Sequence, residues 1–589
     1  MKSSPLVFWC TALTLASIPL IGAACPRRLE PSTSAGGASF GKPSDAGVPD
    51  GAPSFPFQQR GPGRRVAVLY TASVQGYITP CGCTADPLGG VARLAAALDA
   101  ARAAYGERVV FLDAGDLLFE KSDDNKPADL CQAEARIDLL LDTYARKGLA
   151  ATVLGPLDDV RGAEFRDARL AARNLVTVGV SAAGRPMTAG AVHAPGIVVP
   201  AGEVMLGVTG FRADSAEEVT AVSEALRAEV RRLYDEGAHA VVALSQAPRV
   251  LVPAIVAGIE GLDVVVQGRD PGEAPREPER LGAGTFWVAA AQQAQHLGII
   301  ELDLEGRSGA APLSLDDRQG AAERRARLLD QRIVQYEAQV REAASGPRRD
   351  FISQRLDAAR ADRARVLETS AATPAPVGPH IVTSAFPLVR GLPEDGVAKA
   401  ALATYEQSIP ALVGRCEAGL ECAAAPPGVP TYVGVETCYG CHRQAVQFWQ
   451  SQFVVGTGKD QEGRPVERRL SHATAWDTLV NLGKDKDRSC VACHSIGFNE
   501  PGGYCKTSEV DFRQNVQCEA CHGPASEHVA RAGDPAALVR RDVGEQVCRN
   551  CHHVPHIPTT ESFVYNERLQ HILGPGHGEA RWRALPGKE

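Results

Sequence analysis

The chain has 589 residues, of which 44% are hydrophobic and 22% charged, with a net charge of −8. This length exceeds what one hydrophobic core supports, so we expect several domains. The acidic balance excludes a general nucleic-acid binder, and the apolar fraction excludes a wholly disordered chain. Beyond the N-terminus no apolar run approaches the length needed to span a membrane, which excludes a polytopic membrane protein.

Residues 1–24 are predicted to be an export signal. Lys2 supplies a short positive region, residues 5–21 are mostly apolar, and three small residues precede Cys25. The pattern resembles a bacterial lipoprotein signal, which implies acylation of Cys25 and a periplasmic, membrane-anchored protein. Ordinary cleavage nearby, leaving a soluble periplasmic protein, is the alternative. Residues 25–63 are rich in Pro, Gly, Ser and Ala and are expected to be a flexible tether.

Residues 64–305 alternate between apolar runs and helical stretches. We expect buried strands at 66–70, 109–112, 152–154, 204–208, 240–244, 264–266, 285–290 and 299–304. Helices are expected between several of these runs, for instance over 90–105 and 132–147. This alternation predicts an α/β layered domain with helices packed on mainly parallel sheets, and loops after the strands are where such folds place chemistry.

Those loops carry a recognisable series of short motifs. The series is Thr71-Ala72-Ser73-Val74-Gln75-Gly76, Gly89-Gly90 with Arg93, Asp113-Ala114-Gly115-Asp116, Leu154-Gly155-Pro156-Leu157-Asp158, Asn174-Leu175, Leu244-Ser245-Gln246 and Val266-Gln267-Gly268-Arg269. In order and spacing the segment resembles the 5′-nucleotidase-like (calcineurin-like) metallophosphatase family, whose loops hold two divalent metals.

The metal ligands implied by this resemblance are mostly missing. The family's Asp, His and Asn positions fall on Ser73, Gln75, Pro156, Leu157, Gln246 and Arg269, and Asp116 alone clearly remains. Two adjacent dications need several anionic or imidazole ligands. We therefore expect a metallophosphatase-like scaffold without hydrolase activity.

Cysteines outside the C-terminal region suggest disulfides in an exported protein. Cys416 and Cys422 are expected to form a local bridge. Cys81 and Cys83 are too close to bond each other; Cys131 is a candidate partner, and a redox or metal role is the alternative. Cys505 has no obvious partner.

Residues 315–372 have apolar residues stepping by three and four, interrupted at Ser345-Gly346-Pro347. This predicts a charged helical hairpin that acts as a spacer or, alternatively, as a dimerisation element. Residues 373–425 are expected to be a connector with one helix near 395–407.

Residues 426–589 contain four Cys-x-x-Cys-His motifs. They are Cys438, Cys441 and His442; Cys490, Cys493 and His494; Cys518, Cys521 and His522; and Cys548, Cys551 and His552. In c-type haem attachment the two thiols bond one edge of the porphyrin and the adjacent His becomes the proximal iron ligand. Zinc sites and thioredoxin-like pairs do not require His after every second Cys. We therefore predict four c-type haems in a mainly α, loop-rich domain, lying close together as an electron-tunnelling chain.

This region resembles the cytochrome c-554 family of tetrahaem proteins. The matching residues are Cys441-His442 with Trp449, Ser471-His472-Ala473, Cys518-Glu519-Ala520-Cys521-His522-Gly523-Pro524 with His528, and His552 with Gln570-His571. The resemblance implies distal ligation by His472, His528 and His571, and one haem of the four can lack a second protein ligand. The remaining spare histidines are His553, His556 and His577.

Together these features predict an exported multihaem cytochrome that passes electrons to redox partner proteins in a bacterial respiratory chain. A redox enzyme acting on a small nitrogen or sulfur compound at an open haem is the alternative. A phosphoesterase is disfavoured by the missing ligands.

Overall fold

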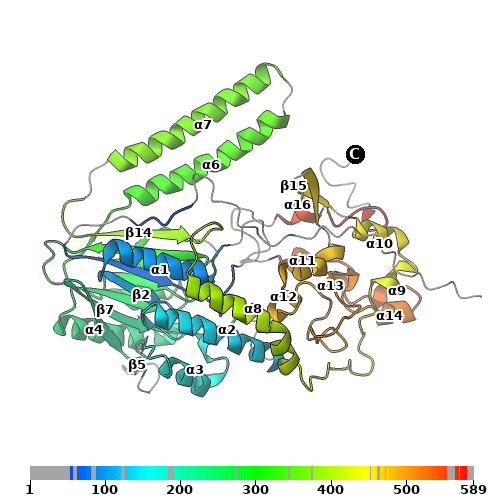
Figure 1. The fold of residues 1–589 in the computed structure, drawn as a ribbon, viewed down its shortest axis with the longest axis horizontal. Coiled ribbons are helices and arrows are strands. Elements are labelled where there is room, and N and C mark those ends of the chain that lie inside the picture. The colour runs from blue at the N-terminus through cyan, green and yellow to red at the C-terminus, as the bar shows by residue number, and fades with distance from the viewer. Residues whose placement is uncertain are drawn as a thin grey trace, which may run out of the picture.

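The computed structural model describes residues 53–57, 63–80, 88–120, 127–182, 192–272, 275–282, 284–342, 345–372, 376–451, 453–459, 465–470, 472–552, 564–569 and 571–579. The predicted export signal, Cys25, most of the tether, Cys81 and Cys83 lie outside these residues, as do His553 and His556. An α/β body, a projecting helical hairpin and a C-terminal region beside the body make up the molecule (Figure 1).

The first of two large sheets has eight strands. Their order is β13 (Ser314–Leu315), β14 (His380–Pro387), β12 (His296–Asp303), β1 (Arg65–Thr71), β2 (Val109–Asp113), β3 (Leu149–Thr152), β4 (Thr177–Val178) and β5 (His193–Ala194). The strands from β1 to β5 run parallel, whereas β12 is antiparallel to both of its neighbours.

The second sheet has six strands. Their order is β10 (Glu279–Leu281), β11 (Thr285–Val288), β9 (Val264–Gln267), β8 (Ala240–Ser245), β7 (Val204–Phe211) and β6 (Gly196–Ala201). Its centre is parallel and both edge strands are antiparallel. The expected parallel arrangement therefore holds from β1 to β5 in the first sheet and at the centre of the second, and both sheets are mixed.

The two sheets pack face to face between layers of helices. In β8, Val242 and Leu244 join the core shared by both sheets, while Val241 and Ala243 face α4 (Val219–Asp235) and α5 (Val252–Val256). The opposite outer face is covered by α1 (Val91–Tyr105), α2 (Pro127–Arg146) and α8 (Gly396–Cys416). Strands buried on both faces explain the nearly continuous apolar runs in the sequence.

The segment predicted to be a connector contributes to the α/β body. Strand β14 pairs with β12 from His380 to Pro387, and α8 packs on the helical layer of the eight-stranded sheet. The edge of β12 would otherwise leave backbone groups unpaired, so β14 completes the sheet. The body thus extends to Cys416.

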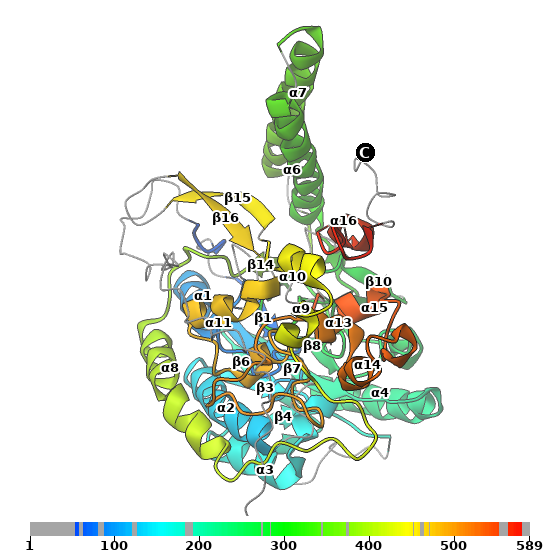
Figure 2. The ribbon, with the colours of Figure 1, turned by 90° about the vertical axis from the view of Figure 1, so that its right-hand side faces the viewer.

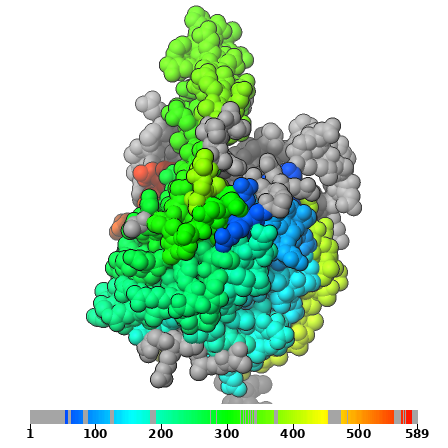
Figure 3. All heavy atoms as spheres, turned by 90° about the vertical axis from the view of Figure 1, so that its left-hand side faces the viewer, coloured from blue at the N-terminus to red at the C-terminus, as the bar shows by residue number. Residues whose placement is uncertain are grey.

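The predicted hairpin is formed by α6 (Arg318–Glu342) and α7 (Pro347–Ala372). Figures 1 and 2 show the two helices side by side, and Figure 3 shows the pair standing out from the body. Ala322, Ala326 and Leu329 of α6 are buried, as are Ile352, Leu356 and Ala359 of α7. The three-and-four spacing therefore supplies one apolar stripe for each helix.

The C-terminal region consists of short helices joined by loops. These are α9 (Val435–Tyr439), α10 (Arg443–Gln450), α11 (Ala475–Leu482), α12 (Arg488–Val491), α13 (Cys518–His522), α14 (Ser526–Ala530), α15 (Glu545–Arg549) and α16 (Tyr565–Leu569), with a hairpin of β15 (Phe453–Lys459) and β16 (Pro465–Leu470). Its buried apolar cluster is small and centres on Trp476, Leu479, Val491 and Tyr504. Within the described residues, no helix has the length and apolar character needed to span a bilayer.

Candidate functional site

Each Cys-x-x-Cys-His motif folds as a single tight turn. In the first motif the backbone N–H of His442 donates to the carbonyl of Cys438 at 2.8 Å, and in the fourth His552 donates to Cys548 at the same distance. The third motif is the whole of α13. Residues spaced by three and four lie on the same side of a helical turn. In the second motif His494 donates to the carbonyl of Val491 at 3.0 Å and Cys493 to that of Cys490 at 3.3 Å. Each motif is therefore one tight turn in which two thiols and one imidazole can share a side, as covalent haem attachment requires.

The motif cysteines differ from the other described cysteines in their bonding. All eight lie outside disulfide bonds. The other four described cysteines form two disulfides, Cys131–Cys416 and Cys422–Cys505, with Cα–Cα distances of 5.5 and 5.6 Å. The predicted local bridge between Cys416 and Cys422 is therefore wrong. Cys416 ends α8 where that helix packs on α2, so its neighbour is Cys131, while Cys422 lies beyond α8, beside Cys505.

Three of the motif histidines each face a second histidine. The ring centroids are 6.1 Å apart for His442 and His528, 6.1 Å for His472 and His552, and 6.0 Å for His522 and His577. A metal bonded by one ring nitrogen from each side at about 2.0 Å needs centroids roughly 6 Å apart. The three pairs therefore fit one iron each between their rings.

Hydrogen bonds orient several of these rings. The Nδ1 atoms of His522, His528 and His577 lie 2.8, 2.8 and 2.9 Å from the backbone carbonyls of Arg540, Asp534 and Ile572. Nδ1 must donate in such a bond because a carbonyl only accepts, which leaves Nε2 available to bind a metal. His494 has the same bond to the carbonyl of Ala475, at 2.6 Å.

Burial favours the neutral imidazole at several of these positions. It lowers the pKa of His494 and of His522. Burial, followed by the nearby charges of His552 and His494, lowers the pKa of His472 to about 4. Neutral imidazole is the form that binds a metal.

Two of the three histidines predicted as distal ligands lie opposite a motif histidine. His472 and His528 each face a motif histidine, whereas His571 is exposed and His577 faces His522. His577 lies in a tight turn in which Gly574 and His577 exchange backbone hydrogen bonds. The only sequence signal for this position was the Gly-rich turn around a histidine. Within the described residues, His494 has no second histidine stacked against its ring.

Neighbouring thiols indicate the spatial order of the motifs. The thiols of Cys438 and Cys518 lie close enough to influence each other's ionisation, as do those of Cys493 and Cys551. Burial and the charges of Cys548 and Cys551 raise the pKa of Cys521 to about 11, which places the third motif beside the fourth. The motifs therefore follow one another in space in the order first, third, fourth, second.

Glu519, inside the third motif, has a structural role. Its buried carboxylate accepts hydrogen bonds from the backbone N–H groups of Val433, Gly434 and Ala525. It thereby holds the start of α9, which carries Cys438, against α13.

In the loops that resemble a metallophosphatase site, the side chains at several expected ligand positions form hydrogen bonds or ion pairs within the protein. The Gln246 amide donates to the carbonyl of Ala114 at 2.6 Å, and Ser73 donates to the carbonyl of Gly268 at 2.7 Å. Arg269 is paired with Asp214. Asp116 accepts from the backbone of Leu157, the position where a metal-binding His was expected. Side chains of Ser73, Asp116 and Gln246 thus bond backbone groups of neighbouring loops.

Three buried carboxyl groups lie near these loops. Burial and the neighbouring Asp158 raise the pKa of Asp116 to about 7, and burial raises that of Asp158 to about 6. Burial also raises the pKa of Asp113 to about 7, although Thr71, Gly115 and Thr152 donate hydrogen bonds to it.

A pKa raised by folding means that protonation stabilises the folded state. For Asp113 this stabilisation is complete below about pH 4, the unfolded value, and is lost as the pH rises toward about 7. Asn cannot titrate, so the Asp113→Asn variant lacks this pH dependence. As the pH rises from 5 to 8, we expect the free energy of unfolding to fall less in the variant than in the wild type. The difference should be a few kcal/mol, because one pKa unit corresponds to about 1.4 kcal/mol. Urea unfolding at several pH values measures this difference. Equal pH dependence of unfolding in both proteins would contradict a raised pKa for Asp113 in the folded state.

Comparison with known proteins finds a family match in the C-terminal region. Residues 437–523 match the family model described as cytochrome c554 and c-prime. Cytochrome c-554 from Nitrosomonas europaea is 33% identical over 95 residues, which are 16% of this chain and 38% of that protein. The chain therefore spans less than half the length of this relative.

Several solved structures resemble the chain at low sequence identity. A 5′-nucleotidase precursor from Thermus thermophilus is 15% identical with a TM-score of 0.39, over 71% of this chain and 74% of that one. The calcineurin-like phosphoesterase YfkN from Bacillus subtilis is 16% identical with a TM-score of 0.33, over 42% and 88%. For the C-terminal region, the predicted resemblance to the cytochrome c-554 family is confirmed over residues 437–523.

Proposed function

We propose that this chain is an exported c-type cytochrome that transfers electrons in a bacterial respiratory chain through four covalently bound haems. The observation that carries the proposal is the set of three facing histidine pairs, each of which includes the histidine of a Cys-x-x-Cys-His motif. Haem, when bound, supplies reversible one-electron redox chemistry.

The residues divide into attachment and ligation roles. The eight motif cysteines, none of which is in a disulfide, would form the thioethers, and His442, His494, His522 and His552 would be the proximal ligands. In this proposal His528 serves the first motif, His577 the third and His472 the fourth, which the distances between the facing rings support. His577 thus takes the role predicted for His571.

The order of the motifs supports transfer along a chain of centres. Adjacent thiols in contact would bring neighbouring haems close together, with the first and second motifs at the two ends. The α/β body would not act as a phosphoesterase, because the loops that would have to hold two metals lack most of the ligands, and Asp116 and Gln246 bond the backbone of neighbouring loops.

A second candidate function is a redox enzyme acting on a small nitrogen or sulfur compound. It is favoured by His494, whose ring faces no second histidine within the described residues and whose Nδ1 is held by a carbonyl. One side of the haem at this motif would then be open to a small ligand. Low-temperature EPR of the oxidised protein separates the two functions: four low-spin signals favour the carrier and a high-spin signal favours the enzyme.

Export and anchoring are proposed from the sequence of residues 1–25. Acylation of Cys25 would attach the chain to a membrane on the periplasmic side, where it would meet redox partner proteins. Mass spectrometry of the mature N-terminus tests this part independently of the haems.

The haem count tests the proposal directly. We expect four haems per chain by pyridine haemochrome assay and intact mass, and three in a Cys548→Ser, Cys551→Ser variant. The matched control is Cys422→Ser, Cys505→Ser, which removes two cysteines of a disulfide and should keep four. A wild-type count below four, or an unchanged count in the first variant, would contradict the assignment.

A further inference from the structure

The second haem motif rests against the α/β body. Helix α2 carries Asp129, Gln132 and Arg136, which lie on one helical face because they are spaced by three and four residues. All three are buried, with exposures of 8%, 1% and 8%. A buried polar stripe on a helix indicates an interface, because polar groups taken out of water need partners.

The partners of this stripe are the residues that lead into α12, which carries Cys490. Gln132 donates to the carbonyl of Lys486 and accepts from the backbone N–H of Arg488, both at 2.9 Å. Arg136 lies 3.4 Å from Asp487, which caps the N-terminus of α12. Asp129 is paired with the buried guanidinium of Arg488. All three side chains therefore contact residues 486–488, just before the first haem cysteine.

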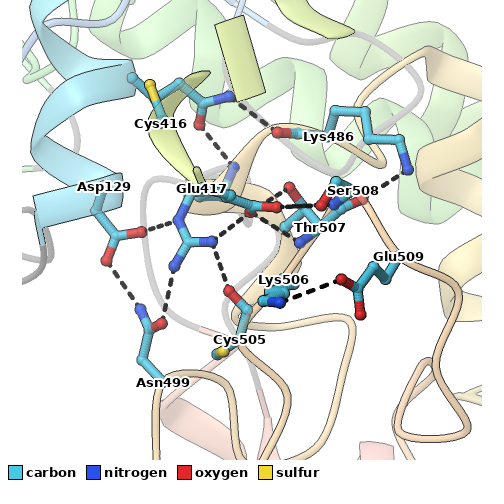
Figure 4. Close-up of polar contacts among 12 residues, drawn as sticks. Asp129, Cys416, Glu417, Lys486, Asn499, Cys505, Lys506, Thr507, Ser508 and Glu509 are labelled. Carbon is cyan, nitrogen blue, oxygen red and sulfur yellow. Dashed lines mark hydrogen bonds and ion pairs between the residues drawn. The ribbon is translucent and has the colours of Figure 1, made fainter. Parts of the chain in front are cut away.

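The same guanidinium joins further parts of the chain. Arg488 is also paired with Glu417 at 2.6 Å and donates to Asn499 at 2.8 Å and to the carbonyl of Cys505 at 2.7 Å. Figure 4 shows Asp129, Glu417, Asn499 and Cys505 close together, and their contacts with Arg488 join all four. Glu417 in turn accepts from Thr507 and Ser508.

Two disulfides flank this network. Cys131, between Asp129 and Gln132 in sequence, is bonded to Cys416, which precedes Glu417. Cys422 is bonded to Cys505, whose carbonyl accepts from Arg488. One disulfide therefore ties α2 to the end of α8, and the other ties the segment after α8 to Cys505, so covalent links lie on two sides of the contact with the second motif.

We propose that Asp129, Gln132 and Arg136 are positioning residues through which the α/β body sets the reduction potential of the haem at the second motif. This inference rests on the proposed function, because it requires a haem at Cys490 and Cys493. Buried charges interact strongly across the low-dielectric interior, whereas exposed charges are screened within about 10 Å at 0.1 M salt. The stripe places one carboxylate and one guanidinium of the body in this buried setting.

The sign of the effect follows from the charge of the oxidised haem. A nearby negative charge stabilises the ferric state, so Asp129→Asn is expected to raise the midpoint potential of one haem. Arg136→Gln is expected to lower the midpoint of that same haem. A substitution that only loosened the interface would instead shift the midpoint potential in the same direction in both variants.

The test is a redox titration of the full-length haem protein, followed by optical and EPR spectra that resolve the four haems. The matched control is Asp138→Asn, which makes the same change on α2 at a carboxylate that is 43% exposed and paired with Arg169 and Arg173 of the body. We expect four unchanged potentials in the control and opposite shifts of one haem in the two stripe variants.

The outcomes distinguish the inference from the proposed function. Fewer than four haems in the wild type contradicts the proposed function itself. Four haems with unchanged potentials, with shifts of the same sign in both variants, or with shifts at all haems overturns the positioning role alone. If Asp129→Asn fails to fold, a lowered midpoint in Arg136→Gln supports the role and an unchanged or raised one overturns it.

Discussion

Replacing His577 with alanine is expected to convert one low-spin haem into a high-spin haem. The rings of His522 and His577 are 6.0 Å apart, and the Nδ1 of each is held by a backbone carbonyl. Loss of His577 removes the ring opposite His522, and alanine offers no replacement ligand. EPR of the oxidised protein should show one additional high-spin centre per chain, with the haem count unchanged.

His571→Ala is the matched control for this experiment. It removes a histidine six residues away, at an exposed position. We expect its EPR spectrum to match that of the wild type. A high-spin signal created by His571→Ala but not by His577→Ala would restore the ligand implied by family resemblance and contradict the geometry.

Replacing Arg488 with methionine is expected to destabilise the contact between the α/β body and the C-terminal region. The change leaves Asp129 and Glu417, which are 8% and 6% exposed, without their shared cation. Breaking a buried ion pair by removing one partner costs about 3–5 kcal/mol. Hydrogen exchange at the amides of α2 and α12 should become faster by the corresponding factor.

Arg531→Met is the control for the charge change. Arg531 forms an exposed pair with Glu527 one turn away, at 3.3 Å. Exposed pairs of this kind contribute about 0.3–0.5 kcal/mol, so exchange in α2 and α12 should be unchanged. Equal effects of the two substitutions would show that the Arg488 network contributes no more than a surface pair.

Local features of the fold were predictable from sequence. Buried strands such as β8 and β9 follow from apolar runs, and the break between α6 and α7 follows from Ser345-Gly346-Pro347. The role of β14 was not predictable, because its place in the sheet depends on the edge of β12, far away in the chain. Long-range pairing of this kind is decided by which backbone edges remain open.

In the candidate site, too, some features were predictable from sequence and others were not. By itself the sequence determined the four attachment motifs, since five consecutive residues contain the two thiols and the imidazole that must share one helical turn. Only the tertiary structure decided that His577 rather than His571 faces His522, that Cys416 bonds Cys131, and that Asp129, Gln132 and Arg136 meet the second motif. These contacts join residues tens to hundreds of positions apart, and their partners are selected by the packing of whole helices, which no local pattern encodes.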